Sequence, residues 1–320
     1  NQEAPAVTAA VRSLCVTRLF IQLTERARIF AADLEKKAIE FRDVVTVGRV
    51  GMRDSVPISI GNQFHAWSAG VRRNVERLET ETAHWRTVSL GAGQLGTGAG
   101  IAPEFGHLAT KKLAERTHLS LQEAEEQMDC ISAHDALLLA HAHIQSLAAV
   151  IWRCTKDLCL MCSGPRCGLG EITFPAVAPG SSIMPGKINP VIPEVVNQVA
   201  FNIIGNDVTI TMAAEAGQLE LNAFEPIIFY NLFESIETLT YAVKTLVDNC
   251  ITGITANKEH CRSQVENSIG VITAICPYVG YETAANIAKE ALRTGRQVRD
   301  LILEKGLMDE EQLNTVLDPY

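Results

Sequence analysis

The chain has 320 residues, of which 47% are hydrophobic, and its formal charge at neutral pH is −9. A chain of this length and composition can bury a substantial core, which excludes a disordered protein. It has no lysine or arginine block, which argues against a nucleic-acid partner because phosphate binding needs cations clustered on one face. The lack of about eighteen uninterrupted apolar residues and of a signal-like start argues against a membrane partner and a targeting segment. Nine cysteines without secretory features predict a reducing compartment, and we expect a soluble, cytoplasmic protein.

Long proline-free stretches predict long helices. Between residues 16 and 41, apolar residues recur at intervals of three and four, which predicts one continuous helical stripe. The members of this stripe are Val16, Phe20, Leu23, Ala27, Phe30, Leu34, Ala38 and Phe41. Further helical stretches are expected at residues 63–89, 131–162 and 193–212.

A second apolar stripe alternates spacings of four and three, which is typical of helices packed nearly parallel in a bundle. Its members are Leu232, Ile236, Leu239, Val243, Leu246 and Cys250. Few alternating β-branched runs occur, so the predicted fold class is all-α. Apolar residues on more than one face at 131–150 and 195–210 predict a homo-oligomeric bundle, with a monomeric bundle as the alternative.

The pattern changes after Asn257 to shorter helices. Pro277, Gly280 and Gly306 punctuate this part, and Asp309 and Gln312 are spaced as a capping box. We therefore predict a central helical-bundle domain over residues 1–254 and a small helical C-terminal domain over residues 255–320.

Four cysteines lie close together in the sequence, and a metal or redox site is one interpretation of them. They are Cys154, Cys159, Cys162 and Cys167. Their apolar helical surroundings favour ordinary small core residues instead. His141 and His143 are two residues apart on a predicted helix, so their side chains diverge and do not chelate one ion. We expect no metal ion.

Residues 163–193 concentrate half of the chain's prolines and several glycines between two long helical stretches. Ser181, Ser182, Lys187 and Asn189 fall within ten residues of this segment. Removing a proton next to a carboxylate makes a doubly charged aci-acid, which forms only where cations and amide donors already face the developing charge. A serine, a lysine and an asparagine suit that chemistry. Spacing alone leaves a catalytic loop and a structural surface loop equally open.

The run Gly180-Ser181-Ser182-Ile183-Met184-Pro185-Gly186-Lys187-Ile188-Asn189-Pro190 resembles the GSSxMPxKxNP signature of the aspartase and fumarase superfamily. The continuations at residues 191–199 and 213–222 resemble aspartate ammonia-lyases more than fumarases, and the similarity extends through residues 267–273 almost to Tyr320. The resemblance implies a helical homotetramer whose composite active sites use several subunits around a central bundle.

The resemblance also implies a reaction and its residues. It implies anti elimination of ammonia from L-aspartate to give fumarate, through an aci-carboxylate intermediate and without a cofactor. Ser181 would be the general base, while Lys187 and Asn189 would bind the substrate's carboxylate. The remaining expected site residues are Ser182 and Thr97 for substrate binding and Glu194 and Met184 in supporting positions. We name residues 176–193 the serine loop.

Three segments depart from the family pattern at positions that bind substrate. Asn1-Gln2 resembles the start of an NQSTND motif, but Glu3-Ala4-Pro5 follows. Val50-Gly51 stands where the family has GRTHxQD, and Gly100 ends a GTGxN motif. Arg53 either compensates for lost charge or is solvated, and we expect the second. The family's N-terminal domain is expected to be absent from this chain.

These departures leave two alternatives beside aspartate deamination. One is a lyase of the same mechanism that acts on an N- or β-substituted aspartate or succinate derivative. The other is a non-catalytic paralogue that retains the tetrameric bundle.

Overall fold

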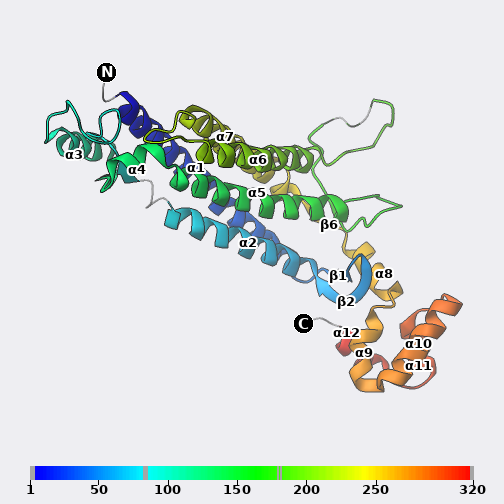
Figure 1. The fold of residues 1–320 in the computed structure, drawn as a ribbon. Helices are drawn as coiled ribbons and strands as arrows, with labels where there is room; N and C mark the ends of the chain where they lie inside the picture. Colours follow the sequence, from blue (N-terminus) through cyan, green and yellow to red (C-terminus); the bar gives the residue numbers. More distant parts are fainter. Residues whose placement is uncertain (1–3, 82–85, 179, 181, 318–320) are drawn as a thin grey trace. The chain divides into compact units, whose positions relative to one another are not determined.

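The computed structural model describes residues 4–81, 86–178, 180 and 182–317, and Figure 1 shows the order of the elements. The long helices are α1 (Ala4–Glu40), α2 (Ile60–Glu81), α5 (Asp135–Met161), α6 (Val191–Glu215) and α7 (Glu225–Asn249). The shorter helices are α3 (Phe105–Thr117), α4 (Gln127–Ser132), α8 (Lys258–Asn267), α9 (Val271–Val279), α10 (Tyr281–Thr294), α11 (Val298–Glu304) and α12 (Glu310–Leu317). The strands are β1 (Val45–Val50), β2 (Arg53–Ser59), β3 (Thr87–Val88), β4 (Gln122–Glu123), β5 (Ile172–Thr173) and β6 (Thr255–Ala256).

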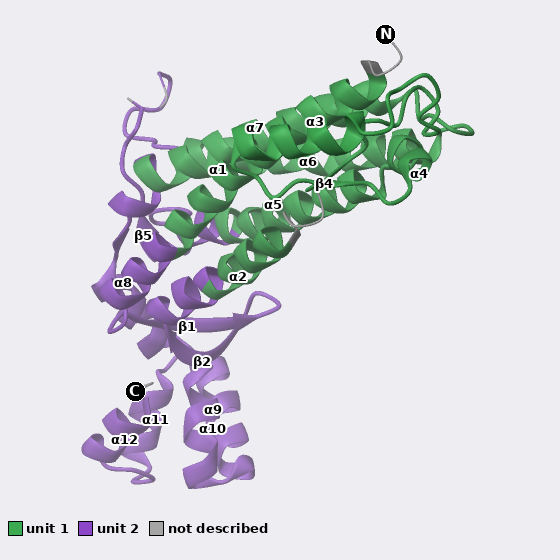
Figure 2. Ribbon diagram, turned by 90° about the vertical axis from the view of Figure 1, so that its left-hand side faces the viewer, with its two compact units in different colours: residues 1–31, 69–156, 191–248 green, residues 32–68, 157–190, 249–320 purple. Residues whose placement is uncertain are grey.

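The chain divides into two compact units, which Figure 2 colours separately. Unit 1 comprises Asn1–Ala31, Ala69–Lys156 and Val191–Asp248, and unit 2 comprises Ala32–Ser68, Asp157–Pro190 and Asn249–Tyr320. Within unit 1, α1, α5, α6 and α7 run side by side as a bundle. The predicted all-α class is therefore confirmed. The predicted domain boundary at residue 254 stays a prediction.

Both predicted apolar stripes form the buried faces of their helices. All eight members of the first stripe, from Val16 to Phe41, and all six members of the second, from Leu232 to Cys250, are buried. Periodic burial of this kind supplies most of the free energy that holds long helices in a bundle, since helix propensity alone is weak.

The ends of three predicted helices differ from the structure. The helix expected at 63–89 ends at Glu81, and β3 follows it. The stretch 131–162 breaks into α4 and α5 because Ala133 is extended. The helix expected at 193–212 runs from Val191 to Glu215. Proline is tolerated in a first helical turn, where the amide has no intrahelical partner, so Pro193 does not start the helix.

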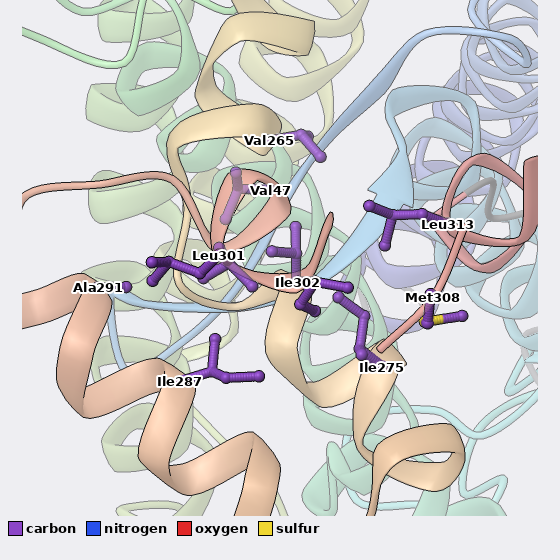
Figure 3. Close-up of a cluster of buried hydrophobic side chains, with 11 residues drawn as sticks. Val47, Val265, Ile275, Ile287, Ala291, Leu301, Ile302, Met308 and Leu313 are labelled. Carbon is purple, nitrogen blue, oxygen red and sulfur yellow. The ribbon is translucent and has the colours of Figure 1, made fainter. Parts of the chain in front are cut away.

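Unit 2 has a hydrophobic core of its own, which joins α8 to α12 with strand β1 (Figure 3). Its buried members are Val47, Val265, Val271, Ile275, Ile287, Ala291, Val298, Leu301, Ile302, Met308 and Leu313. The predicted capping box at the start of α12 is confirmed. The backbone amide of Gln312 donates to Asp309 Oδ1 at 2.8 Å, and the backbone amide of Asp309 donates to Gln312 Oε1 at 3.2 Å.

The antiparallel pair β1 and β2 was not predicted. It is a hairpin in which Val50 pairs with Arg53 around the two-residue turn Gly51-Met52. Both turn residues have positive φ angles, 56° and 63°, as a type I′ turn requires. The pair also carries an irregularity between Val47 and Arg49, which breaks the alternation expected of a strand.

By length and composition, two described helices could cross a membrane, Pro5–Glu40 and Asp135–Met161. Apolar core helices of helical bundles pass the same test. Both helices carry buried apolar residues along their length, such as Phe20 in α1 and Ile144 in α5.

Candidate active site

The serine loop follows β5 and runs into the first turn of α6, and its described residues 182–189 are exposed. The exposed side chains include Ser182, Met184, Lys187 and Asn189. Ser181, the expected general base, lies outside the described residues. Within the described part of the chain, no carboxylate pairs with Lys187, so its ammonium group is available to an anionic ligand.

The backbone of the serine loop folds back on itself. The Lys187 amide donates to the Met184 carbonyl oxygen at 3.1 Å. Gly180 has a φ of 86°, and a Cβ atom there would lie 2.9 Å from the Lys187 carbonyl oxygen. Any side chain at Gly180 would meet the backbone at Lys187, so glycine is required for this approach. The backbone of Lys187 therefore lies next to Gly180, the first residue of the signature.

The segment before the loop is held by many contacts, in contrast to the loop itself. Strand β5 pairs with β6 through Ile172 and Thr173. Asn257 donates its side-chain amide to the Gly170 carbonyl oxygen at 2.5 Å, and its backbone amide to the Glu171 carbonyl oxygen at 2.8 Å. Gln264 donates to the Leu169 carbonyl oxygen at 2.7 Å. Residues 169–173, which we call the loop base, are therefore held in place by hydrogen bonds before the serine loop begins.

A buried ion pair lies at this base. The Glu171 carboxylate has 0% exposure, and its Oε1 accepts from Arg49 at 2.8 Å and from the Thr46 hydroxyl. Its Oε2 atom is buried without a hydrogen-bond partner among the described residues. The negative charge of Glu171 also acts on Cys261. Burial of the Cys261 thiol is the larger cause and the Glu171 carboxylate the second, and together they raise the pKa of this thiol to about 11.

The hairpin that carries Arg49 also presents two of the altered family positions. Val50 is 74% exposed, and Gly51 is in the turn. The opposite strand is held by Ser268, whose hydroxyl donates to Asp54 at 2.8 Å. Arg53 is exposed, as expected of a solvated arginine.

The other two expected site residues belong to unit 1, whereas the serine loop up to Pro190 belongs to unit 2. Thr97 is exposed, and its hydroxyl accepts from the Ala99 amide at 3.4 Å. Glu194 is exposed in the first turn of α6. Ser182, Met184, Lys187 and Asn189 lie on one loop of unit 2, whereas Thr97 and Glu194 belong to unit 1.

The cysteines adopt an ordinary structural arrangement. Cys154 is buried in α5, and the Cys162 thiol donates to the Cys159 carbonyl oxygen at 3.3 Å. Burial, followed by neighbouring Cys159 and Cys162, raises the pKa of Cys250 to about 12, which keeps that thiol protonated and unreactive. Across residues 4–81, 86–178 and 182–317, no group of three His, Cys, Asp or Glu side chains is arranged to hold a metal ion.

Comparison with known protein families decides the affiliation. A family model described as Lyase matches residues 6–205, and a second, described as Fumarase C C-terminus, matches residues 271–320. The chain belongs to the aspartase and fumarase superfamily of lyases. The resemblance carried by the serine-loop signature is thereby confirmed, and the signature lies inside the region that the lyase model matches.

Individual lyases agree with this assignment. An aspartate ammonia-lyase from a Bacillus species is 44% identical over 307 residues, which are 96% of this chain and 66% of that protein. The aspartate ammonia-lyase of Escherichia coli K12 is 42% identical over 95% of this chain and 63% of its own length. A solved fumarate lyase:delta crystallin from Brucella melitensis has a TM-score of 0.93 and 41% identity, over 97% of this chain and 67% of that one. This chain thus spans about two thirds of the length of these lyases.

One buried polar network of this chain was not predicted from the sequence. His141 of α5 has 0% exposure, its Nδ1 lies 2.8 Å from Asp207 Oδ1 in α6, and its Nε2 lies 3.0 Å from Ser235 Oγ in α7. Asn206 also donates to Ser235 at 3.2 Å. The signal was present in the sequence, since His141 lies four residues after Leu137 and three before Ile144 on the buried stripe of α5. A histidine on a core-facing stripe requires polar partners from neighbouring helices.

Proposed function

We propose that the protein is a carbon–nitrogen lyase that eliminates ammonia from L-aspartate to give fumarate. The observation that carries this proposal is the exposed serine loop, whose Lys187 has no carboxylate partner among the described residues. The loop lies in a chain 42% to 46% identical to several proteins named aspartate ammonia-lyase.

In the proposed reaction, the Ser181 alkoxide takes a proton from the β-carbon of aspartate. The electrons of that C–H bond move into the adjacent carboxylate, which becomes a doubly charged aci-acid. Lys187 and Asn189 stabilise this developing charge, and Ser182 and Thr97 hold the substrate. The aci-acid then collapses to form the carbon–carbon double bond, and the bond to the α-nitrogen breaks so that ammonia departs with its electron pair. A preorganised cation lowers the barrier because it already faces the charge that forms in the transition state.

We further propose a homotetramer with composite active sites. Helix α6 exposes a set of large apolar side chains that a helical partner would cover. These side chains are Val195, Phe201, Val208 and Met212. We also propose that each chain divides into two domains near residue 254. The protein is proposed to be soluble and cytoplasmic.

The assay is the ultraviolet absorbance of the conjugated product when the purified full-length protein is incubated with L-aspartate. Product formation that Ser181→Ala abolishes, and that Ser182→Ala affects mainly through KM, supports the proposal. Product formation that is equal in the protein and in Ser181→Ala would exclude Ser181 as the base.

A second candidate keeps the elimination but changes the substrate. The specific observation is that the hairpin presents exposed Val50, with Gly51 beside it, at the altered family position. An apolar, uncharged tip favours an N- or β-substituted aspartate or succinate derivative over aspartate itself. Ser181-dependent turnover of such a compound, with L-aspartate inert, favours this candidate. Failure of every amino and hydroxy diacid, in an intact assembly, favours the non-catalytic paralogue.

A further inference from the structure

The segment Leu169–Thr173 is where the chain leaves the fixed part of unit 2 and enters the serine loop. Its side chains and carbonyl groups are bound by residues from β6 and α8, as described above. Glu171 adds a link of another kind, because its side chain reaches the β1–β2 hairpin instead. The contacts of Glu171 therefore join the serine loop's base to a second, distant segment.

The link is electrostatic and buried. Glu171 is fully buried, and the Arg49 side chain is 17% exposed. Arg49 also donates to the Val47 carbonyl oxygen at 3.2 Å and to Gln264 Oε1 at 3.4 Å, so the guanidinium contacts the hairpin, the loop base and α8 together. Thr46, in the same strand, donates to the same carboxylate oxygen. The Glu171 carboxylate thus accepts hydrogen bonds from two side chains of β1, those of Thr46 and Arg49.

A buried ion pair contributes little net stability, because removing two charges from water costs about as much as their attraction returns. Apolar residues of similar volume would hold the same segments together equally well. What the pair adds is geometry, since the Arg49 guanidinium donates at once to Glu171, to the Val47 carbonyl oxygen and to Gln264, and so links three segments in one arrangement.

We propose that Glu171 and Arg49 are positioning residues, which fix the base of the serine loop against the β1–β2 hairpin so that Lys187 and Asn189 are held in the geometry the elimination needs. The catalytic part of this inference rests on the proposed function. The positioning part concerns only the conformation of the loop.

Three variants separate positioning from stability. Glu171→Gln removes the charge but keeps an acceptor for Thr46, and it leaves Arg49 without its counter-ion. Arg49→Met removes the cation and keeps most of the side-chain volume. The double variant Arg49→Met/Glu171→Gln has no buried charge, so it regains the stability that either single change loses. Arg262→Met is the matched control, because Arg262 and Glu266 form an exposed ion pair 3.1 Å apart within α8.

Two readouts apply to the full-length protein. The first is the kinetics of aspartate elimination: all three variants are expected to lower kcat by about tenfold to a hundredfold with KM nearly unchanged, since small displacements of catalytic groups have effects of this size. The second is hydrogen exchange of the hydrogen-bonded amides of Gly170, Glu171 and Lys187, which is expected to become faster in all three. The control is expected to match the unaltered protein in both.

The decisive variant is the double one. If it regains both the melting temperature and the kcat of the unaltered protein, the pair is only structural and the inference is overturned. Unchanged hydrogen exchange of the Gly170, Glu171 and Lys187 amides in the three variants overturns it as well. If the unaltered protein turns over no diacid, the proposed function fails, and the exchange measurement alone decides the positioning.

Discussion

The serine loop and the polar network at His141 differ in almost every physical respect. The loop exposes its polar side chains, and Lys187 has no carboxylate partner among the described residues. In the network, the His141 side chain is inaccessible to solvent, and both of its ring nitrogens have partners. Polar groups that bind a ligand lack protein partners in its absence, whereas polar groups that hold helices together form hydrogen bonds within the fold. We therefore predict that substitutions in the loop alter catalysis without altering stability, and that substitutions in the network alter stability without altering catalysis.

The largest expected effect is that of Lys187→Ala. Loss of the cation that faces the aci-carboxylate should lower kcat by about a hundredfold to a thousandfold. The melting temperature should stay unchanged, because the side chain is exposed and makes no ion pair within the described residues. Steady-state kinetics and thermal unfolding of the same preparation measure both. Lys111→Ala, an exposed lysine of α3, is the control and should change neither.

Asp207→Ala tests the opposite region. The change leaves the Nδ1 atom of buried His141 without its partner, and an unsatisfied buried group costs about 1–3 kcal/mol. Urea unfolding at fixed protein concentration measures the loss, because association changes apparent stability. Asp157→Ala is a suitable comparison in the same helix as His141. A fully stable Asp207→Ala protein would show that the network does not hold the three helices together.

His141→Gln should alter the pH dependence of stability. Burial lowers the pKa of His141 below its ordinary value of 6.5, while the hydrogen bond and charge of Asp207 oppose that shift. Below about pH 6.5 the unfolded chain therefore takes up a proton that the folded chain does not, and stability falls as the pH falls. One such group contributes at most about 1.4 kcal/mol per pH unit.

The expected outcome is a smaller loss of unfolding free energy between pH 7 and pH 5.5 in the variant than in the unaltered protein. His134 has its pKa lowered by burial as well, so part of the acid sensitivity should remain. Parallel pH profiles in the two proteins would contradict the assignment of this proton to His141.

The smallest expected effect is that of Asp309→Ala, in the capping box of α12. The carboxylate accepts from the Gln312 amide at 2.8 Å, and loss of such a cap costs about 1 kcal/mol. Unfolding free energy should fall by that amount while kcat stays constant. Asp309→Asn retains an acceptor and should restore most of the loss. A change in kcat would mean that the small C-terminal helices influence the active site.

The sequence predicted the features that depend on local pattern. The stripes of α1 and α7 are visible because burial repeats with the helical period, and the serine loop is visible because its prolines and glycines interrupt that period. The β1–β2 hairpin was not predicted because Gly48 interrupts the alternation of apolar and polar side chains along β1. A Cβ atom at Gly48 would lie 2.5 Å from the Val56 carbonyl oxygen, a contact that only the folded hairpin reveals.

The candidate site shows the same division. The signature named Lys187 and Asn189, but the partners of Glu171 could not be read from the chain, because Arg49 precedes it by 122 residues. Only the fold brings those two charges together. The network at His141 stands between these cases, since its histidine lies on a visible stripe while Asp207 and Ser235 come from other helices.

Proton nuclear magnetic resonance of L-aspartate incubated with the full-length protein tests the proposed elimination and the role of Lys187 together. We expect fumarate and ammonium to appear in equal amounts with the unaltered protein and with Lys111→Ala. We expect neither to appear at a comparable rate with Lys187→Ala, although that variant keeps its melting temperature. Undiminished turnover by Lys187→Ala would show that Lys187 does not stabilise the charge formed in the elimination.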